Sequence, residues 1–135
     1  MKISQINLTG FRCFKEATLI ELKLVNGLIG SNGSGKTAVL QSLLRLFGPR
    51  SSERFIQPAD FFVERGSKLA DVPERKLSIE AELCFPELLV KNGDEEAVAN
   101  CFKHMSMQSE GAAPICRVLL EATWTRDNTP EGSGE

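Results

Sequence analysis

Eight consecutive residues carry the chemistry of a phosphate-binding loop. Residues 30–37 read Gly-Ser-Asn-Gly-Ser-Gly-Lys-Thr, the complete pattern G-x-x-x-x-G-K-[ST]. The glycines allow a tight backbone turn, so that main-chain N–H groups approach an anion closely. Lys36 is expected to meet the β- and γ-phosphates, and Thr37 to place its hydroxyl on Mg²⁺. The motif predicts a site for ATP with Mg²⁺, with GTP left open, formed by Gly30, Ser31, Asn32, Gly33, Ser34, Gly35, Lys36 and Thr37.

The motif should follow a strand and open a helix, and its flanks fit both requirements. Leu28 and Ile29 form a short apolar run that predicts the strand. Gly48-Pro49 ends the helix. Helical periodicity predicts that Leu40, Leu43, Leu44 and Phe47 face the core, and that Gln41, Ser42 and Arg45 face away. The competing interpretation is a glycine-rich turn between a strand and a core helix, and this context favours the nucleotide site.

Alternating polar and apolar residues indicate a sheet with one wet face. Strands are expected at 2–8, 18–24, 76–85 and 115–125. The turn dipeptide Asn26-Gly27 folds the second strand back toward the one that leads into the phosphate loop. A half-wet sheet fits antiparallel pairing better than a fully covered parallel sheet. The rest is expected to be irregular or partly helical at 48–75, helical at about 94–105, and a polar tail at 127–135.

Size and composition indicate an ordinary globular domain. The chain has 135 residues, of which 41% are hydrophobic and 25% charged, enough for one domain with one core. Its net charge of −2 gives no overall attraction to DNA or membranes. No apolar run reaches membrane-spanning length and the first residues do not begin a signal peptide, so a cytoplasmic setting without membrane contact is expected.

Cysteine and histidine give no sign of a transition-metal site. The four cysteines lie far apart without a C-x-x-C pair, which predicts reduced core thiols. His104 is the single histidine, and one histidine without a neighbouring ligand pair is more often structural than a metal ligand. Mg²⁺ at Thr37 is therefore the one metal that the sequence predicts.

The N-terminal arrangement resembles a known group of proteins. A short strand, the segment Phe11-Arg12-Cys13-Phe14, a second strand and the loop at 30–37 look like the N-terminal lobe of ABC-type ATPases of the RecF/SMC kind. Further segments are similar to the start of OLD-family ATP-dependent endonucleases. These are Pro58-Ala59-Asp60-Phe61-Phe62, Phe85-Pro86-Glu87-Leu88, Phe102-Lys103-His104-Met105 and Leu120-Glu121-Ala122-Thr123-Trp124-Thr125.

The resemblance implies an ATPase head joined to a C-terminal Toprim nuclease that acts on DNA. It also makes Arg12 a second nucleotide candidate, because relatives often place a basic residue there near the phosphates or base. The competing interpretation of Arg12 is an exposed arginine between two core phenylalanines. The expected fold is α/β: an incomplete P-loop NTPase lobe of the ABC-ATPase type over residues 1–135, with an antiparallel β layer near the loop helix.

Several parts of the family pattern have no counterpart in these residues. A Q-loop, a signature motif, an apolar strand ending in Asp-Glu and the Toprim metal site are missing, and Asp60 and Asp71 occur in loop-like sequence. Hydrolysis in this class needs a carboxylate to position water and charge from a second subunit. The expectation is an N-terminal segment that binds Mg-ATP weakly and hardly hydrolyses it. Unpaired apolar sheet edges favour a homodimer or oligomer.

Three other functions stay open at this point. A nucleotide-switched DNA-repair or chromosome-organising ATPase of the RecF/SMC type, without a nuclease, uses the same loop. A small-molecule or nucleoside kinase also shares the loop, but the half-wet strands disfavour its parallel, fully covered sheet. A binding or decoy module without enzymatic activity is the third.

Overall fold

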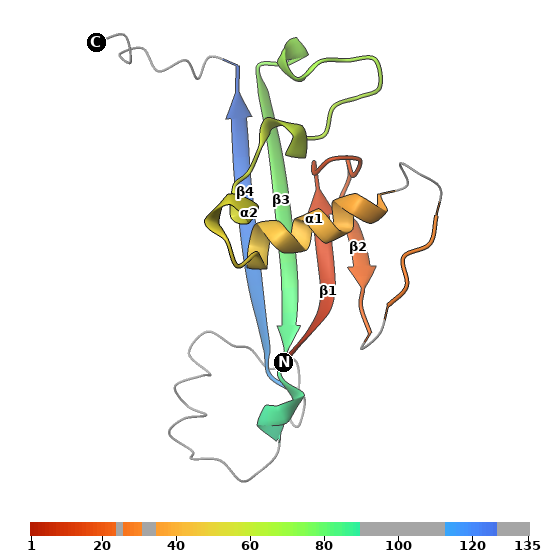
Figure 1. Cartoon of the computed structure of the whole chain (residues 1–135), viewed down its shortest axis with the longest axis vertical. Coiled ribbons are helices and arrows are strands. Elements are labelled where there is room, and N and C mark those ends of the chain that lie inside the picture. Colours follow the sequence, from red (N-terminus) through yellow and green to blue (C-terminus); the bar gives the residue numbers. More distant parts are fainter. Residues whose placement is uncertain (24–25, 31–34, 90–112, 127–135) are drawn as a thin grey trace, which may run out of the picture. The chain divides into compact units, whose positions relative to one another are not determined.

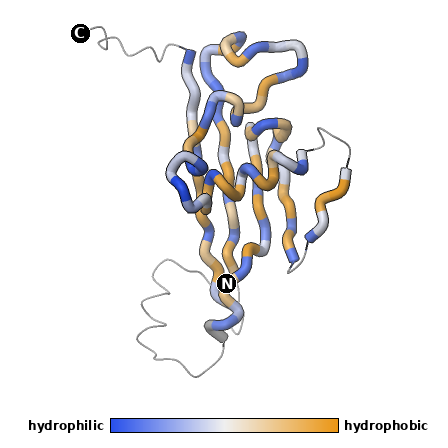
Figure 2. The backbone as a smooth tube through the Cα atoms, in the orientation of Figure 1, coloured by the Kyte–Doolittle hydropathy of each residue, from blue (hydrophilic) through white to orange (hydrophobic). Residues whose placement is uncertain are grey.

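Four strands form one antiparallel sheet. The computed structural model describes residues 1–23, 26–30, 35–89 and 113–126. The strands are β1 (Lys2–Thr9), β2 (Thr18–Glu21), β3 (Glu74–Cys84) and β4 (Ile115–Thr125), in the order β2-β1-β3-β4. Neighbouring arrows run in opposite directions in Figure 1, and the half-wet alternation in the sequence predicted this arrangement. Figure 2 shows the alternation of polar and apolar residues along the strands.

Helical structure is concentrated after the phosphate loop. The main helix, α1, spans Lys36–Phe47 and begins within the loop motif. The segment at 48–75 contains α2 (Ser51–Arg54) and two 3₁₀ turns, η1 (Pro58–Asp60) and η2 (Leu69–Asp71). A third 3₁₀ turn, η3 (Pro86–Leu89), follows β3. Within the described residues, no helix is long and apolar enough to cross a bilayer.

Residue contacts group the chain into two units. Unit 1 comprises Met1–Asn7, Leu19–Gly27 and Glu80–Leu119. Its buried apolar residues are Ile6, Ala81, Leu83 and Ile115. Glu82 is also buried, 8% exposed, although the alternation at 76–85 predicts that it faces water together with Ser78 and Glu80. Its carboxylate accepts hydrogen bonds from Ser4 Oγ at 2.8 Å and from Arg117 Nε and Nη2 at 3.3 Å, so the buried charge is paired.

Unit 2 holds the phosphate-loop motif and comprises Leu8–Thr18, Leu28–Ile79 and Leu120–Glu135. Its core is built around Phe11, which is fully buried. The other buried apolar residues come from strands β1 and β3, from α1 and from the segment after η1: Leu8, Leu77, Ile79, Ala38, Val39 and Phe61. This unit therefore contains every described residue that the motif predicts for the nucleotide site.

Helix α1 faces the opposite way from the prediction. Its buried residues are Ala38, Val39, Ser42 and Arg45. The residues expected in the core are exposed, Leu40 by 56%, Leu44 by 36% and Phe47 by 42%, and Leu43 is half-buried. The prediction was wrong because buried polar partners decide the orientation. Ser42 Oγ donates to the carbonyl of Val39 at 2.6 Å, and Arg45 pairs with the buried Asp60.

The strand predicted immediately before the phosphate loop is absent. Residues 28–30 are irregular and exposed, with Ile29 98% exposed. Strand β2 ends at Glu21, and Asn26 instead closes a turn by pairing its side-chain amide with the backbone of Lys23. An apolar pair forms a strand only with a neighbouring strand, and the described residues supply none here. The predicted helix at 94–105 and the tail at 127–135 lie outside the described residues.

Candidate functional site

The two ends of the phosphate-loop motif are described, and Ser31, Asn32, Gly33 and Ser34 lie outside the described residues. Gly30 precedes the gap, and Gly35, Lys36 and Thr37 follow it. Gly35 caps the N-terminus of α1, Lys36 is the first residue of the helix and Thr37 the second. The structure therefore places the last three motif residues at a helix N-terminus, as the motif requires.

Gly35 occupies a position that strongly favours glycine. Its φ of 100° lies in the left-handed region, which L side chains rarely adopt. A Cβ there would lie 2.7 Å from Cζ of Phe14 and 3.1 Å from Sγ of Cys13. Cys13 and Phe14 therefore pack directly against the last glycine of the motif. That contact explains on steric grounds why the motif needs a glycine here.

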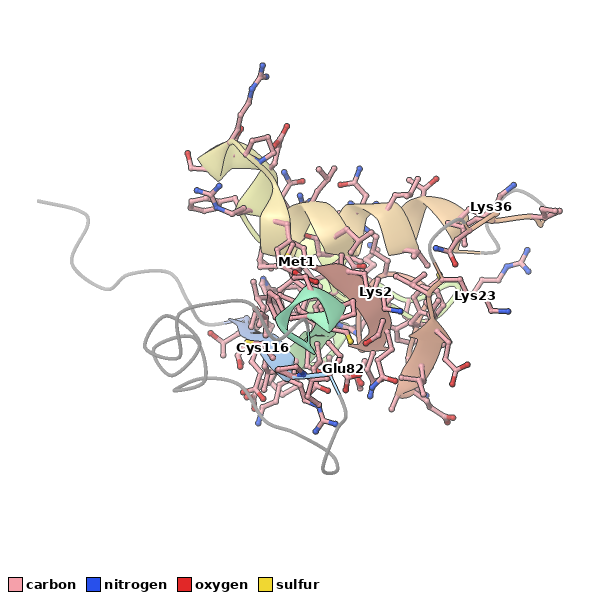
Figure 3. The ribbon with its side chains drawn as sticks, turned by 90° about the horizontal axis from the view of Figure 1, so that it is seen from below. Met1, Lys2, Lys23, Lys36, Glu82 and Cys116 are labelled. Carbon is pink, nitrogen blue, oxygen red and sulfur yellow. The ribbon has the colours of Figure 1, made fainter. Side chains whose placement is uncertain are left out.

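Lys36 joins the two described ends of the motif. Its Nζ donates a hydrogen bond to the carbonyl of Gly30 at 2.5 Å, and Figure 3 shows Lys36 at the beginning of α1. The first turn of α1 contains no acidic residue, so the positive end of the helix dipole is not neutralised by a neighbouring carboxylate. Thr37 is exposed in the same turn. The ammonium, the helix terminus and the hydroxyl together suit a phosphate chain with Mg²⁺.

Arg12 is hydrogen-bonded to Asp60 and is also partly exposed to solvent. Its guanidinium lies 5.8 Å from the ring centroid of the buried Phe11 and is hydrogen-bonded to Asp60 through Nε at 3.1 Å and Nη2 at 3.0 Å. Its side chain is 28% exposed. The backbone of Arg12 is left-handed, with φ of 48°, and its N–H donates to the carbonyl of Asp60 at 2.7 Å. Arg12 is thus more constrained than an ordinary surface arginine.

Asp60 accepts hydrogen bonds from both Arg12 and Arg45, and the sequence did not predict this role. The side chain is fully buried, and its Oδ2 accepts from Arg45 Nε at 2.8 Å and from the backbone N–H of Gln57 at 2.9 Å. Burial by itself raises the pKa of Asp60. The hydrogen bonds from Arg45, Gln57 and Arg12 outweigh burial and hold this pKa below its ordinary value. Asp60 is therefore an ionised carboxylate, and no local pattern in the sequence signals it.

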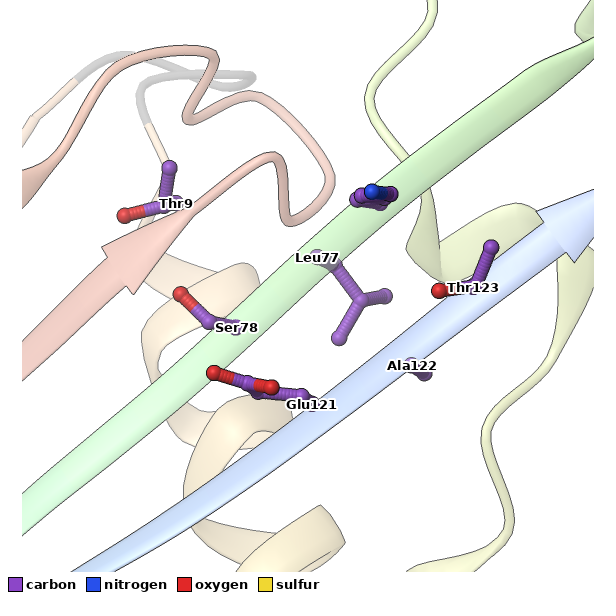
Figure 4. A pocket seen from close by; sticks show the side chains of 7 residues that line it. Thr9, Leu77, Ser78, Glu121, Ala122 and Thr123 are labelled. Carbon is purple, nitrogen blue, oxygen red and sulfur yellow. The ribbon is translucent and has the colours of Figure 1, made fainter.

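Unit 2 contains more than two surface hollows, and two of them differ in whether a candidate residue lines them. One, of about 570 Å³, is lined by Arg12, Cys13, Pro58, Ala59, Phe61, Val63 and Leu69. The other, of about 270 Å³, is lined by Thr9, Lys76, Leu77, Ser78, Glu121, Ala122 and Thr123, and is seen in Figure 4. No residue of the phosphate-loop motif lines either hollow. The first contains Arg12, the second candidate residue, and lies beside the segment that packs on Gly35.

The described residues contain no group of three or more His, Cys, Asp or Glu side chains that would hold a metal ion. Among the thiols, Cys13 is exposed, and Cys84 and Cys116 are half-buried, without a disulfide. The prediction that the cysteines lie in the core was therefore wrong for these three thiols, because Cys13 lies in an exposed turn and the other two are only half-buried. Within the described part of the chain, Thr37 is the residue whose hydroxyl stands at the phosphate loop, where it would hold Mg²⁺ together with a nucleotide.

Comparison with known proteins agrees with this geometry. A stretch of 70 residues, 52% of the chain, is 37% identical to structural maintenance of chromosomes protein 6 of Dictyostelium discoideum. The chain covers 5% of the length of that protein. Residues 1–115, which include the whole motif and the cluster around Asp60, match the AAA ATPase domain. The chain belongs to the AAA ATPase domain family.

Proposed function

We propose that this chain binds ATP with Mg²⁺ as the N-terminal part of a larger ATPase that acts on DNA. The observation that carries the proposal is the Lys36 ammonium, which reaches across the motif to Gly30 from the N-terminus of a twelve-residue helix. A bound triphosphate would compete with the Gly30 carbonyl for this ammonium, and the free N–H groups of the first helical turn would bind the same anion. Thr37 would hold the metal.

The proposed cofactors follow from the chemistry of these groups. The cation and the helix terminus attract the negative charge of the β- and γ-phosphates, and Mg²⁺ bridges their oxygens. The motif residues Gly30 to Thr37 and Arg12 are proposed as the binding set. Hydrolysis by these residues alone is expected to be very slow, because the described residues show no carboxylate that would position water beside Lys36.

Two activities are proposed for the complete protein. The first is an ATP-dependent DNA endonuclease of the OLD type, supported by the resemblance of the segments at 58–62 and 120–125. The second is a nucleotide-switched repair or chromosome-organising ATPase without a nuclease. The stretch shared with structural maintenance of chromosomes protein 6 supports this second activity. Nicking of supercoiled plasmid by the full-length protein with Mg²⁺ and ATP would favour the first. In both, a homodimer and DNA are the proposed partners, in a cytoplasmic setting.

The test of nucleotide binding compares three forms of the chain. Affinity for a fluorescent ATP analogue is measured with Mg²⁺ for the native chain, for Lys36→Ala and for Lys2→Ala, which removes an exposed lysine at the start of β1. Because Lys36 supplies the ammonium for the phosphates, Lys36→Ala should raise the Kd about tenfold or more, equal to about 1.4 kcal/mol. Lys2→Ala should leave it unchanged. Equal Kd values for the native chain and Lys36→Ala would reject the proposal.

A further inference from the structure

The carboxylate of Asp60 holds two arginines that come from different parts of unit 2. Arg45 belongs to α1, and Arg12 to the turn that follows β1. Oδ1 accepts from Arg12 Nε and Nη2 and, at 3.3 Å, from Arg45 Nη2, while Oδ2 accepts from Arg45 Nε. One negative charge therefore faces two positive ones, and the cluster keeps a net positive charge. Without the carboxylate, the two guanidinium groups would repel each other.

The backbone on either side of Asp60 is also joined to the Arg12 turn. The N–H of Arg12 donates to the carbonyl of Asp60, and the N–H of Phe62 donates to the carbonyl of Gly10 at 2.9 Å. Phe11 and Phe61 form an antiparallel bridge between these bonds. The turn itself is closed by reciprocal hydrogen bonds between Phe11 and Phe14. Residues 10–14 are therefore joined through the backbone to the segment around Asp60.

The same turn packs against the phosphate-loop motif on its other side. Phe14 and Cys13 leave no space for a Cβ on Gly35. Arg45, which anchors the carboxylate from the helix, lies ten residues after Gly35 on α1. Contacts thus run from the helix through Arg45, Asp60 and the Arg12 turn to Gly35, the cap of the same helix, which Cys13 and Phe14 of that turn contact.

We propose that Asp60 is a positioning residue for nucleotide binding, which orients the guanidinium of Arg12 on the turn whose next two residues pack against Gly35. This inference rests on the proposed function. Asp60 itself is fully buried and acts through Arg12, which is partly exposed and keeps Nη1 without a hydrogen-bond partner among the described residues. That nitrogen is available to an anionic ligand. Because its other donors are fixed on Asp60, the guanidinium would bind with little loss of conformational freedom.

The experiment is a double-mutant cycle on nucleotide affinity. The Kd for Mg-ATP is measured for the native chain, Asp60→Asn, Arg12→Gln and the double variant. If Asp60 acts through Arg12, Asp60→Asn should raise the Kd about tenfold in the native background and less than twofold once Arg12 is replaced. The same fold-change in both backgrounds, or no change in either, would overturn the inference. If Asp60→Asn does not fold, Asp60→Glu takes its place, because it keeps the charge but displaces it.

Glu82→Gln is the matched control for loss of stability. Glu82 is also a buried carboxylate hydrogen-bonded to an arginine, but it belongs to unit 1. This variant should lose stability, as measured by denaturant unfolding, and keep the native Kd. A Kd increase in Glu82→Gln as large as that in Asp60→Asn would overturn the inference. Lys36→Ala separates the two proposals: normal binding by Asp60→Asn with loss of binding by Lys36→Ala removes only the positioning role.

Discussion

Replacement of Gly35 by alanine tests the packing of the Arg12 turn against the phosphate loop. Two costs are expected. The left-handed backbone disfavours alanine by about 1–2 kcal/mol. The new Cβ would also lie 2.7 Å from Cζ of Phe14, roughly 0.8 Å inside an ordinary carbon–carbon contact. Overpacking of this kind costs about 1–3 kcal/mol. The free energy of unfolding should therefore fall by about 2–5 kcal/mol in total.

Gly66 provides the control for the backbone cost. Its φ of 83° is also left-handed, but a Cβ there would meet nothing within 4 Å. Gly66→Ala should therefore lose only the strain of about 1–2 kcal/mol. Urea unfolding of both variants gives the difference, which is the contribution of the contact with Phe14 and Cys13. Equal losses in the two variants would refute the close packing of this turn on Gly35.

A double-mutant cycle between Gly35 and Phe14 tests whether Phe14 makes this contact. In a Phe14→Leu background, the ring carbon nearest to Gly35 is gone, so Gly35→Ala should cost at least about 1 kcal/mol less than in the native background. The Cys13 Sγ contact at 3.1 Å remains in that background, so relief should be partial. Strictly additive losses would show that the two residues do not touch.

Three further predictions follow from unit 2. The folded-state pKa of Asp60 is depressed, so its stabilisation is complete above the ordinary value of 3.8 and is lost as the pH falls through the lower folded value. The free energy of unfolding should therefore fall less steeply with decreasing pH in Asp60→Asn than in the native chain, by up to about 1.4 kcal/mol per pH unit. Parallel curves for the two proteins would contradict this. The orientation of α1 is tested by two substitutions. Ser42→Leu should lower the free energy of unfolding by about 1–3 kcal/mol through overpacking, whereas Leu40→Ser should change it by no more than about 0.5 kcal/mol. A larger loss for Leu40→Ser than for Ser42→Leu would favour the orientation predicted from the sequence. The exposed Cys13 thiol should be alkylated more slowly in saturating Mg-ATP, with Cys13→Ser as the control for the other thiols, and an unchanged rate would place the nucleotide elsewhere.

The motif and the strands were accessible from the sequence because both are local patterns. The G-x-x-x-x-G-K-[ST] spacing requires a helix that begins at Lys36, and α1 begins there. Alternation over consecutive residues also requires a strand with one buried face. In β3 the buried side chains of Leu77, Ile79, Ala81 and Leu83 follow that period. Such features depend on neighbours in sequence, and the order of the residues reveals them.

The orientation of α1 was not accessible, because its cause lies outside the helix. Two faces compete: an apolar one with Leu40, Leu44 and Phe47, and a mixed one with Ser42 and Arg45. Periodicity favours the first, since it counts only apolar residues. The structure buries the second because Asp60, fifteen residues after Arg45, supplies a buried carboxylate for its guanidinium. Nothing within the helix signals that partner.

The buried charges explain why this part of the fold is organised around polar contacts. A buried ion pair often adds little to the stability of a protein, because apolar residues of similar volume in the same place stabilise it as well or better. Ion pairs with fixed hydrogen-bond geometry instead constrain position, and the fork of a guanidinium matches a carboxylate in only a few orientations. Asp60 uses that constraint twice, toward Arg45 on the helix and toward Arg12 on the turn. An apolar contact in its place would leave the Arg12 guanidinium without a partner that fixes its orientation. The cluster therefore fixes where a positive side chain stands relative to Gly35, the glycine that begins the helix of the phosphate loop.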